Sequence, residues 1–283
     1  PTPRLEIEAD GRLNWALEHN GIPVVREVRI VNPGVAAIGP ATLVLSIEPG
    51  FAPALTLQIP GVPAGGVYTV ARPDVRLDGL RLRALTERDK GRLIVVLRAG
   101  EAELARIEKP IEVLAASEWN ATAPPELLAS FVLPNHRGTG RILKEARTLL
   151  GSATGDPSLD GYRRKSRERV RAAAESIYRA LQRFDVSYAA PPASFESEGQ
   201  KIRLPDEVLD QRLGSCLDLS VLFAAACEQA GLNPLILVSK GHALPAVWLV
   251  DEDLPAAVVY DAASLKKLVD AGEILPVEAT VAC

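Results

Sequence analysis

Residues 211–232 read QRLGSCLDLSVLFAAACEQAGL, and this stretch decides how the second half of the chain folds. Its apolar residues continue at helical spacing from Leu217 through Leu222 to Ala226. Gly231 follows, and glycine commonly stands just after the end of a helix. The pattern predicts a buried helix with Cys216 at its N-terminus. There the free N–H groups and the helix dipole favour an anion, so we expect a lowered thiol pKa and a reactive thiolate. Cys227, about three turns further along, is expected to be inert core.

A nucleophilic thiol works best beside an imidazole, which takes its proton and later protonates the leaving group. The chain has three histidines. His19 and His136 precede the cysteine's domain, whereas His242 follows a glycine at the start of a predicted strand, so His242 is the candidate partner. From the residues alone a structural thiol stays open, because a buried free cysteine behaves as a small hydrophobe.

The composition of the whole chain is that of a globular protein. Of its 283 residues 47% are hydrophobic and 24% charged, and the length favours two domains. A formal charge of -4 gives no global attraction to nucleic acid or an anionic membrane. The three cysteines form no disulfide framework and no metal-binding spacing, which predicts a reducing compartment and no metal.

The sequence also predicts a cytoplasmic protein without a membrane segment. No stretch approaches 18 uninterrupted apolar residues, and the first ten residues, PTPRLEIEAD, lack the pattern of a signal peptide. The chain contains no methionine and begins at Pro1, which is typical of a piece of a longer protein.

Residues 1–117 read as a succession of short strands separated by turn clusters such as NPG, EPG and PAGG. Strands at this spacing, with no helical period between them, predict an antiparallel β-sandwich, and we expect an immunoglobulin-like one. Residues 118–160 then change character. Pro124 and Pro125 open a helix candidate, and residues 138–150 have helical spacing, which predicts a helical connector.

Residues 161–283 are expected to form an α+β domain, since predicted helices are followed by predicted strands. The first helix, expected over residues 162–184, begins with a run of basic residues for which a phosphate-binding face and a solvated face both stay open. A mostly irregular segment, residues 185–216, leads to the cysteine. Two strands lie around Gly241 and His242, and a short helix and a last strand follow. Pro245 removes a ladder donor, which predicts an edge strand or a bulge.

Three segments, GSCLDLSVLFAAACEQAGLNPLIL, GHALPAVWL and ILPVEATV, together resemble the signature of the transglutaminase-like superfamily of papain-like cysteine enzymes. That family has a Cys at a helix start within Gly-x-Cys-x-Asp, a His on the next strand and an acid at a further strand. Gly214, Cys216 and Asp218 match the first part, His242 the second, and Glu278 stands where the family has Asp. The resemblance covers residues from about 160 to 283.

The resemblance implies a Cys216–His242–acid triad that acts on an amide bond. Glu278 is the favoured acid; Asp251 and Asp261 are alternatives, because a helix-sized insertion containing them separates Glu278 from His242. Gln200 is a candidate oxyanion donor, as in papain-like sites. Asp218 is expected to cap the helix without entering the chemistry, and Trp248 to be core.

The sequence therefore predicts a cysteine-dependent hydrolase, a peptidase or amidase with a protein or peptide substrate and no cofactor. The alternative is a catalytically inactive transglutaminase-like module for protein interaction or nucleic-acid association. Upstream, LLASFVLPNHRGTGRIL, GQKIRLPDEVL and the preceding strands resemble the N-terminal regions of large bacterial proteins that carry helicase modules. This second resemblance implies that the chain works with the rest of such a polypeptide.

Overall fold

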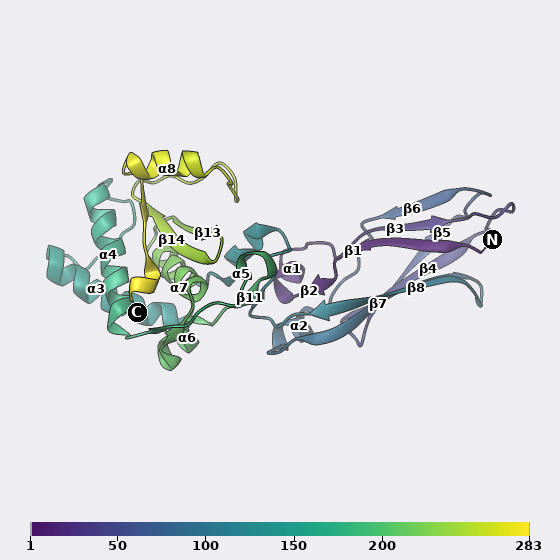
Figure 1. Ribbon diagram of the computed structural model, residues 1–283, viewed down its shortest axis with the longest axis horizontal. Helices are drawn as coiled ribbons and strands as arrows, with labels where there is room; N and C mark the ends of the chain where they lie inside the picture. The colour runs from purple at the N-terminus through teal and green to yellow at the C-terminus, as the bar shows by residue number, and fades with distance from the viewer. Residues whose placement is uncertain (1, 283) are drawn as a thin grey trace. The chain divides into compact units, whose positions relative to one another are not determined.

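The computed structural model describes residues 2–282 and contains helices together with several antiparallel sheets, a mixed α+β architecture (Figure 1). The chain divides into two compact units, residues 1–118 and 119–283. Each unit has a hydrophobic core of its own.

The first unit consists mainly of two sheets. One has the strand order β1-β3-β6 and the other the order β2-β8-β7-β4-β5, and every pair is antiparallel except β2 with β8. The strands are β1 Arg4–Ala9, β2 Arg12–Leu13, β3 Val25–Val31, β4 Ala41–Glu48, β5 Ala52–Ile59, β6 Val67–Ala71, β7 Asp89–Ala99 and β8 Ala102–Val113.

Side chains from both sheets share one core. In β4 the buried residues alternate with partly exposed ones, as a strand with one face in a core requires. Leu43 and Leu45 from β4 belong to the same buried cluster as Val28 and Ile30 from β3. Two short helices, α1 (Trp15–His19) and α2 (Gly79–Ala84), lie where the sequence predicted only strands and turns. Both are too short to show a helical period.

The second unit contains three long helices and a three-stranded sheet. The helix α7 (Cys216–Gln229) is buried over nearly its whole length. It packs against α3 (Arg137–Thr154) and α4 (Arg167–Arg183) and also against the sheet. The sheet has the order β13-β14-β15, with β13 Pro234–Ser239, β14 His242–Trp248 and β15 Ile274–Pro276. Thus α3, which lies in the expected connector, contributes to the same core as α7.

The remaining elements of the second unit are short. The helix α8 (Ala262–Asp270) precedes β15, and the 3-10 helices η1 (Pro125–Phe131) and η2 (Ala279–Ala282) lie near its two ends. Among residues 2–282, no helix has both the length and the apolar character needed to cross a bilayer.

The segment before the cysteine is more regular than its sequence suggested. It contains β10 (Ser187–Tyr188), α5 (Phe195–Glu198), β11 (Gln200–Lys201), α6 (Pro205–Gln211) and β12 (Leu213–Gly214). Proline at the first position and acids in the first turn define the start of α6, signals that the sequence did contain.

The expected helix over residues 162–184 starts later than predicted. Its N-cap is Ser166, whose side chain accepts a hydrogen bond from the Arg169 N–H, and the helix α4 begins at Arg167. The basic residues 163–165 therefore precede the helix, and Lys165 has a φ of 51°, in the left-handed region. The predicted basic helix face is wrong for these three residues.

The prediction that Pro245 marks an edge strand or a bulge is also wrong. The strand β14 is central, and Pro245 pairs with Ile236 of β13 in regular register. The Pro245 carbonyl accepts from the Val277 N–H at 2.9 Å, just after β15. Because the nitrogen and the carbonyl of a strand residue point to the same side, the Pro245 ring nitrogen also faces β15. Because β15 ends at Pro276, the missing N–H falls where the ladder stops.

Candidate functional site

The start of α7 is held by a reciprocal pair of side-chain hydrogen bonds. The Asp218 N–H donates to the Ser215 Oγ at 3.3 Å, and the Ser215 N–H donates to the Asp218 Oδ2 at 2.8 Å. This capping box satisfies two donors that the first helical turn leaves free. It fixes the backbone on both sides of Cys216.

Asp218 also ties this turn to the segment before α6. Its carboxylate accepts from the Arg203 N–H and from the Arg203 guanidinium, each at 2.8 Å, and its side chain is fully buried. The expectation that Asp218 caps and positions the helix is confirmed by these contacts. All four of its hydrogen bonds are with groups that position the chain.

The predicted low pKa of the Cys216 thiol is wrong for this structure. The residue exposes 0% of its surface, and burial raises the thiol pKa above the ordinary 9.0, with a smaller contribution from the Asp218 carboxylate. Hydrogen bonding from the Ala243 and Leu217 backbone and from the Tyr188 side chain lowers it by less. Burial outweighs these hydrogen bonds, so the thiol pKa is raised and the resting thiol is neutral.

His242 and Glu278 lie together at one end of the sheet. The His242 Nε2 and the Glu278 Oε2 are 2.8 Å apart, and β14 and β15 are neighbours in the sheet. Thr280 donates to the other carboxylate oxygen from its N–H at 3.1 Å and its hydroxyl at 2.5 Å. Burial raises the pKa of Glu278, but these bonds from Thr280 and His242 outweigh it and hold that pKa below its usual value.

This pairing fixes which nitrogen of the imidazole is available. A neutral ring that donates from Nε2 to a carboxylate carries its lone pair on Nδ1, the atom that can act as a base. The backbone N–H of Ala243, the next residue on β14, faces the Cys216 thiol. Within residues 2–282, no hydrogen bond joins that thiol to the His242 imidazole.

The other predicted site residues lie in different settings. The Gln200 side chain is buried beside the cysteine, where its Nε2 donates to the Ser215 Oγ at 2.9 Å and its Oε1 has no partner within residues 2–282. Asp261 is exposed and caps α8, accepting from the N–H groups of Ala263 and Ser264. The structure brings Gln200 to the start of α7 and leaves Asp261 to its own helix.

The remaining candidates have structural roles. The His19 ring stacks on Trp15 at 4.6 Å, and the His136 Nδ1 caps α3 by accepting from the Gly138 N–H. Cys227 and Trp248 are buried in apolar clusters, as predicted.

Tyr188 is a site residue that the sequence did not indicate. It pairs with Gly214 in the parallel ladder of β10 and β12, which brings it beside the start of α7. Hydrogen bonding from its side chain is one of the effects that lower the thiol pKa of Cys216. Only the pairing of two strands of two residues each creates this contact, and such short strands have no sequence signal.

The acidic, cysteine and histidine side chains of residues 2–282 include no group of three or more that could hold a metal ion. Cys216 and Cys227 are both free thiols. The chemistry that this site offers is that of a thiol, an imidazole and a carboxylate.

No family model matches the chain, and no curated protein matches it. Among solved structures it is similar to a candidate late embryogenesis abundant protein, with 13% identity and a TM-score of 0.24 over 41% of this chain and 73% of that one. It is also similar to a candidate protease from Parabacteroides distasonis, with 14% identity and a TM-score of 0.26 over 78% of this chain. The match spans 43% of that protein's length. Similarities this low indicate nothing about function, so the interpretation of the site depends on the geometry of its own residues.

Proposed function

We propose that this protein is a cysteine-dependent hydrolase of amide bonds, with a peptide or protein as its substrate. The observation that carries the proposal is the 2.8 Å contact between the His242 Nε2 and the Glu278 carboxylate, on the strand whose next residue faces the Cys216 thiol. A carboxylate that orients an imidazole in this way makes its other nitrogen a base. A base that can reach a thiol supports acyl transfer.

The proposed reaction uses His242 as a general base, because the resting thiol is neutral. The Nδ1 takes the thiol proton as the sulfur attacks the substrate carbonyl carbon. When the tetrahedral intermediate collapses, the C–N bond breaks and Nδ1–H protonates the departing amine. Water then hydrolyses the thioester and regenerates the Cys216 thiol.

Two donors can stabilise the negative oxygen of the tetrahedral intermediate. The Cys216 backbone N–H lies at the start of α7, where helix N–H groups have no partner within the helix. The Gln200 side-chain nitrogen carries two hydrogens, and one of them already donates to Ser215. Its second hydrogen is the proposed oxyanion donor.

The burial of Cys216 favours a second candidate function. A thiol with no exposed surface and a raised pKa cannot attack a carbonyl unless its cover moves. If the cover never moves, the domain is a catalytically inactive module that binds a partner. The two candidates make opposite predictions for the reactivity of this thiol.

The finer parts of the fold and the context belong to the same proposal. We propose that the first unit is an immunoglobulin-like β-sandwich and the second a transglutaminase-like domain, on the motifs around Cys216, His242 and Glu278. The resemblance of the upstream residues supports a place in a larger, helicase-containing bacterial protein of the cytoplasm. The proposed chemistry needs no cofactor.

The experiment that tests the function measures the alkylation of Cys216 by iodoacetamide at pH 7, read by peptide mass spectrometry. The wild type is compared with His242→Ala. Loss of a general base lowers a rate by about 10²- to 10⁴-fold, so we expect the variant to label at least about 100-fold more slowly. Cys227 is the internal control, because it lies in the apolar core cluster of the same unit and stays unlabelled while the domain is folded.

Equal labelling rates in the two proteins, with Cys227 protected in both, would favour the inactive module. Labelling of both cysteines in the variant would instead indicate unfolding. The Glu278→Gln variant then takes its place, because it keeps the imidazole and removes only the negative charge that orients it.

A further inference from the structure

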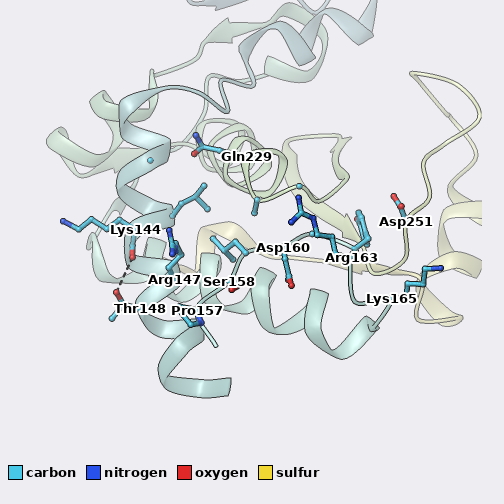
Figure 2. Close-up of a pocket in the computed structure, with 17 residues that line it drawn as sticks. Lys144, Arg147, Thr148, Pro157, Ser158, Asp160, Arg163, Lys165, Gln229 and Asp251 are labelled. Atoms are coloured by element: carbon cyan, nitrogen blue, oxygen red, sulfur yellow. Dashed lines mark hydrogen bonds between the residues drawn. The ribbon is translucent and has the colours of Figure 1, made fainter. Parts of the chain in front are cut away.

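A broad hollow lies at the opposite end of α7 from Cys216. Its cavity volume is about 1450 Å³, and its lining comes from α3, from residues 157–165, from residues 229–231 at the end of α7 and from Asp251 (Figure 2). The distance along the helix from Cys216 to Gln229 is about 20 Å at 1.5 Å per residue. The hollow is therefore separate from the proposed catalytic site.

Four basic side chains of this hollow have no acidic partner. Lys144 and Arg147 come from α3 and Arg163 and Lys165 from the segment before α4, and within residues 2–282 none of the four forms an ion pair. Figure 2 shows the first two toward one side of the hollow and the last two toward the other. All four are exposed in a chain whose net charge is -4.

The acids near these cations do not cancel them. Asp160, which lines the hollow, is already paired with Arg164 at 2.7 Å and lies 3.7 Å from Arg169. Asp251 remains as the one acid of the described lining without an ion pair. The local charge is positive, and it is available to a ligand.

The segment that carries Arg163 and Lys165 is held in place before any ligand binds. The Arg169 guanidinium donates to the carbonyls of Asp156 and Ser158, at 3.0 and 2.6 Å. Gly161 packs on the end of α7 so closely that a Cβ there would lie 2.5 Å from the Gly231 carbonyl oxygen. A fixed segment loses little conformational entropy on binding.

We propose that this hollow binds the phosphate backbone of double-helical nucleic acid. Its volume exceeds the 300–1,000 Å³ that is usual for small-molecule pockets, and its cations lie toward both sides rather than around one point. Such an arrangement fits a ligand with many separated negative charges. Tyr162 is the aromatic residue of the described lining, and its hydroxyl is bound to the Trp248 carbonyl and the Asn233 N–H. Its ring packs against two apolar clusters of the second unit rather than standing free for a base to stack on, which favours a duplex over a single strand.

The test measures binding of the full chain to a fluorescein-labelled 20-base-pair DNA duplex by anisotropy, at salt concentrations from 50 to 200 mM. Four phosphate contacts give a slope of log K against log salt of about -3.6, or about a 150-fold loss of affinity across this range. The double variant Lys144→Gln and Arg147→Gln leaves two contacts. We expect its slope to fall to about -1.8, which is about a 12-fold loss across the same range.

The control is the double variant Arg83→Gln and Arg98→Gln, which removes the same charge from exposed positions of the first unit. It is expected to keep the wild-type slope. Failure to bind the duplex at 50 mM salt, or equal slopes in the two double variants, would overturn the proposal. Binding of polyglutamate in place of DNA would also overturn it and would identify the hollow as a docking surface for acidic protein. None of these outcomes depends on whether Cys216 is catalytic.

Discussion

The replacement Asp218→Asn tests whether the carboxylate at the start of α7 holds this region together. Its Oδ1 accepts from the Arg203 N–H, and its Oδ2 accepts from the Ser215 N–H and from the Arg203 guanidinium. Asparagine has the same shape but only one acceptor oxygen. At least one buried backbone N–H therefore loses its partner, and Arg203 loses its anion.

The expected cost can be worked from these contacts. An unsatisfied buried donor costs about 1–3 kcal/mol. The Arg203 side chain is 33% exposed, so losing its ion pair adds only about 1 kcal/mol after solvent screening. We expect the free energy of unfolding of the second unit to fall by about 2–4 kcal/mol. Urea titration followed by circular dichroism at 222 nm measures this change, because the long helices lie in that unit.

The matched control is Asp261→Asn at the exposed N-cap of α8. Asparagine caps a helix about as well as aspartate, so this change is expected to cost less than about 0.5 kcal/mol. If Asp218→Asn cost as little as its control, the reasoning about the buried carboxylate would be refuted.

Three further predictions concern the surroundings of the site. Gly199 has a φ of 95°, and Gly199→Ala places a Cβ 2.0 Å from the Trp119 carbonyl oxygen. We therefore expect the free energy of unfolding, measured by thermal denaturation, to fall by at least about 3 kcal/mol. Tyr188→Phe removes a hydrogen bond that lowers the thiol pKa of Cys216, so the midpoint of its alkylation rate against pH should move upward. The pKa of Glu278 lies below its ordinary 4.5, so its stabilising effect is present above that value and is lost as the pH falls through the folded-state pKa. The difference between the melting temperatures of the wild type and Glu278→Gln should therefore shrink as the pH is lowered.

Each of these predictions has a result that would contradict it. Gly155→Ala is the control for Gly199→Ala, because Gly155 also has a positive φ but has open space where a Cβ would lie. Equal losses in the two would mean that the close carbonyl is unimportant. An unchanged pH midpoint of alkylation in Tyr188→Phe would show that the Tyr188 hydroxyl does not influence the thiol pKa of Cys216. A difference in melting temperature that stays constant as the pH falls below 4.5 would show that Glu278 is not the titrating group.

The long elements of this fold could be predicted from the sequence because their apolar patterns extend over many residues. The helices α3 and α7 and the strands β4 and β7 all have such patterns. The short elements could not be predicted in the same way. The helices α1 and α2 and the strands β10 and β12 are set by caps and by contacts with distant residues.

The sequence predicted the pairing of His242 with Glu278 but not the electrostatics of Cys216. Motif order pointed to Cys216, His242 and Glu278, and the neighbouring strands β14 and β15 explain why the last two meet. The local field of the helix N-terminus alone predicts a low thiol pKa for Cys216. Burial by other elements, which a local pattern does not contain, raises that pKa.

The basic residues between positions 163 and 169 could not be interpreted from the sequence alone either. Arg164 and Arg169 are near Asp156 and Asp160, and Arg167 lies close to the Ala271 and Gly272 carbonyls, so these three are used within the fold. The sequence could not separate them from Arg163 and Lys165. The partners of Arg167 lie on a segment far along the chain, and only the folded chain shows which cations remain available.

The most direct test of the central claim is the acetylation of Cys216 by p-nitrophenyl acetate, an activated ester that requires no substrate specificity. Release of p-nitrophenolate gives the rate, and peptide mass spectrometry identifies the acetylated residue. We predict an acetyl thioester on Cys216 in the wild type that forms at least about 100-fold more slowly in His242→Ala. No acetylation of Cys216 in the wild type, or the same rate in both proteins, would contradict a hydrolase built on Cys216 and His242.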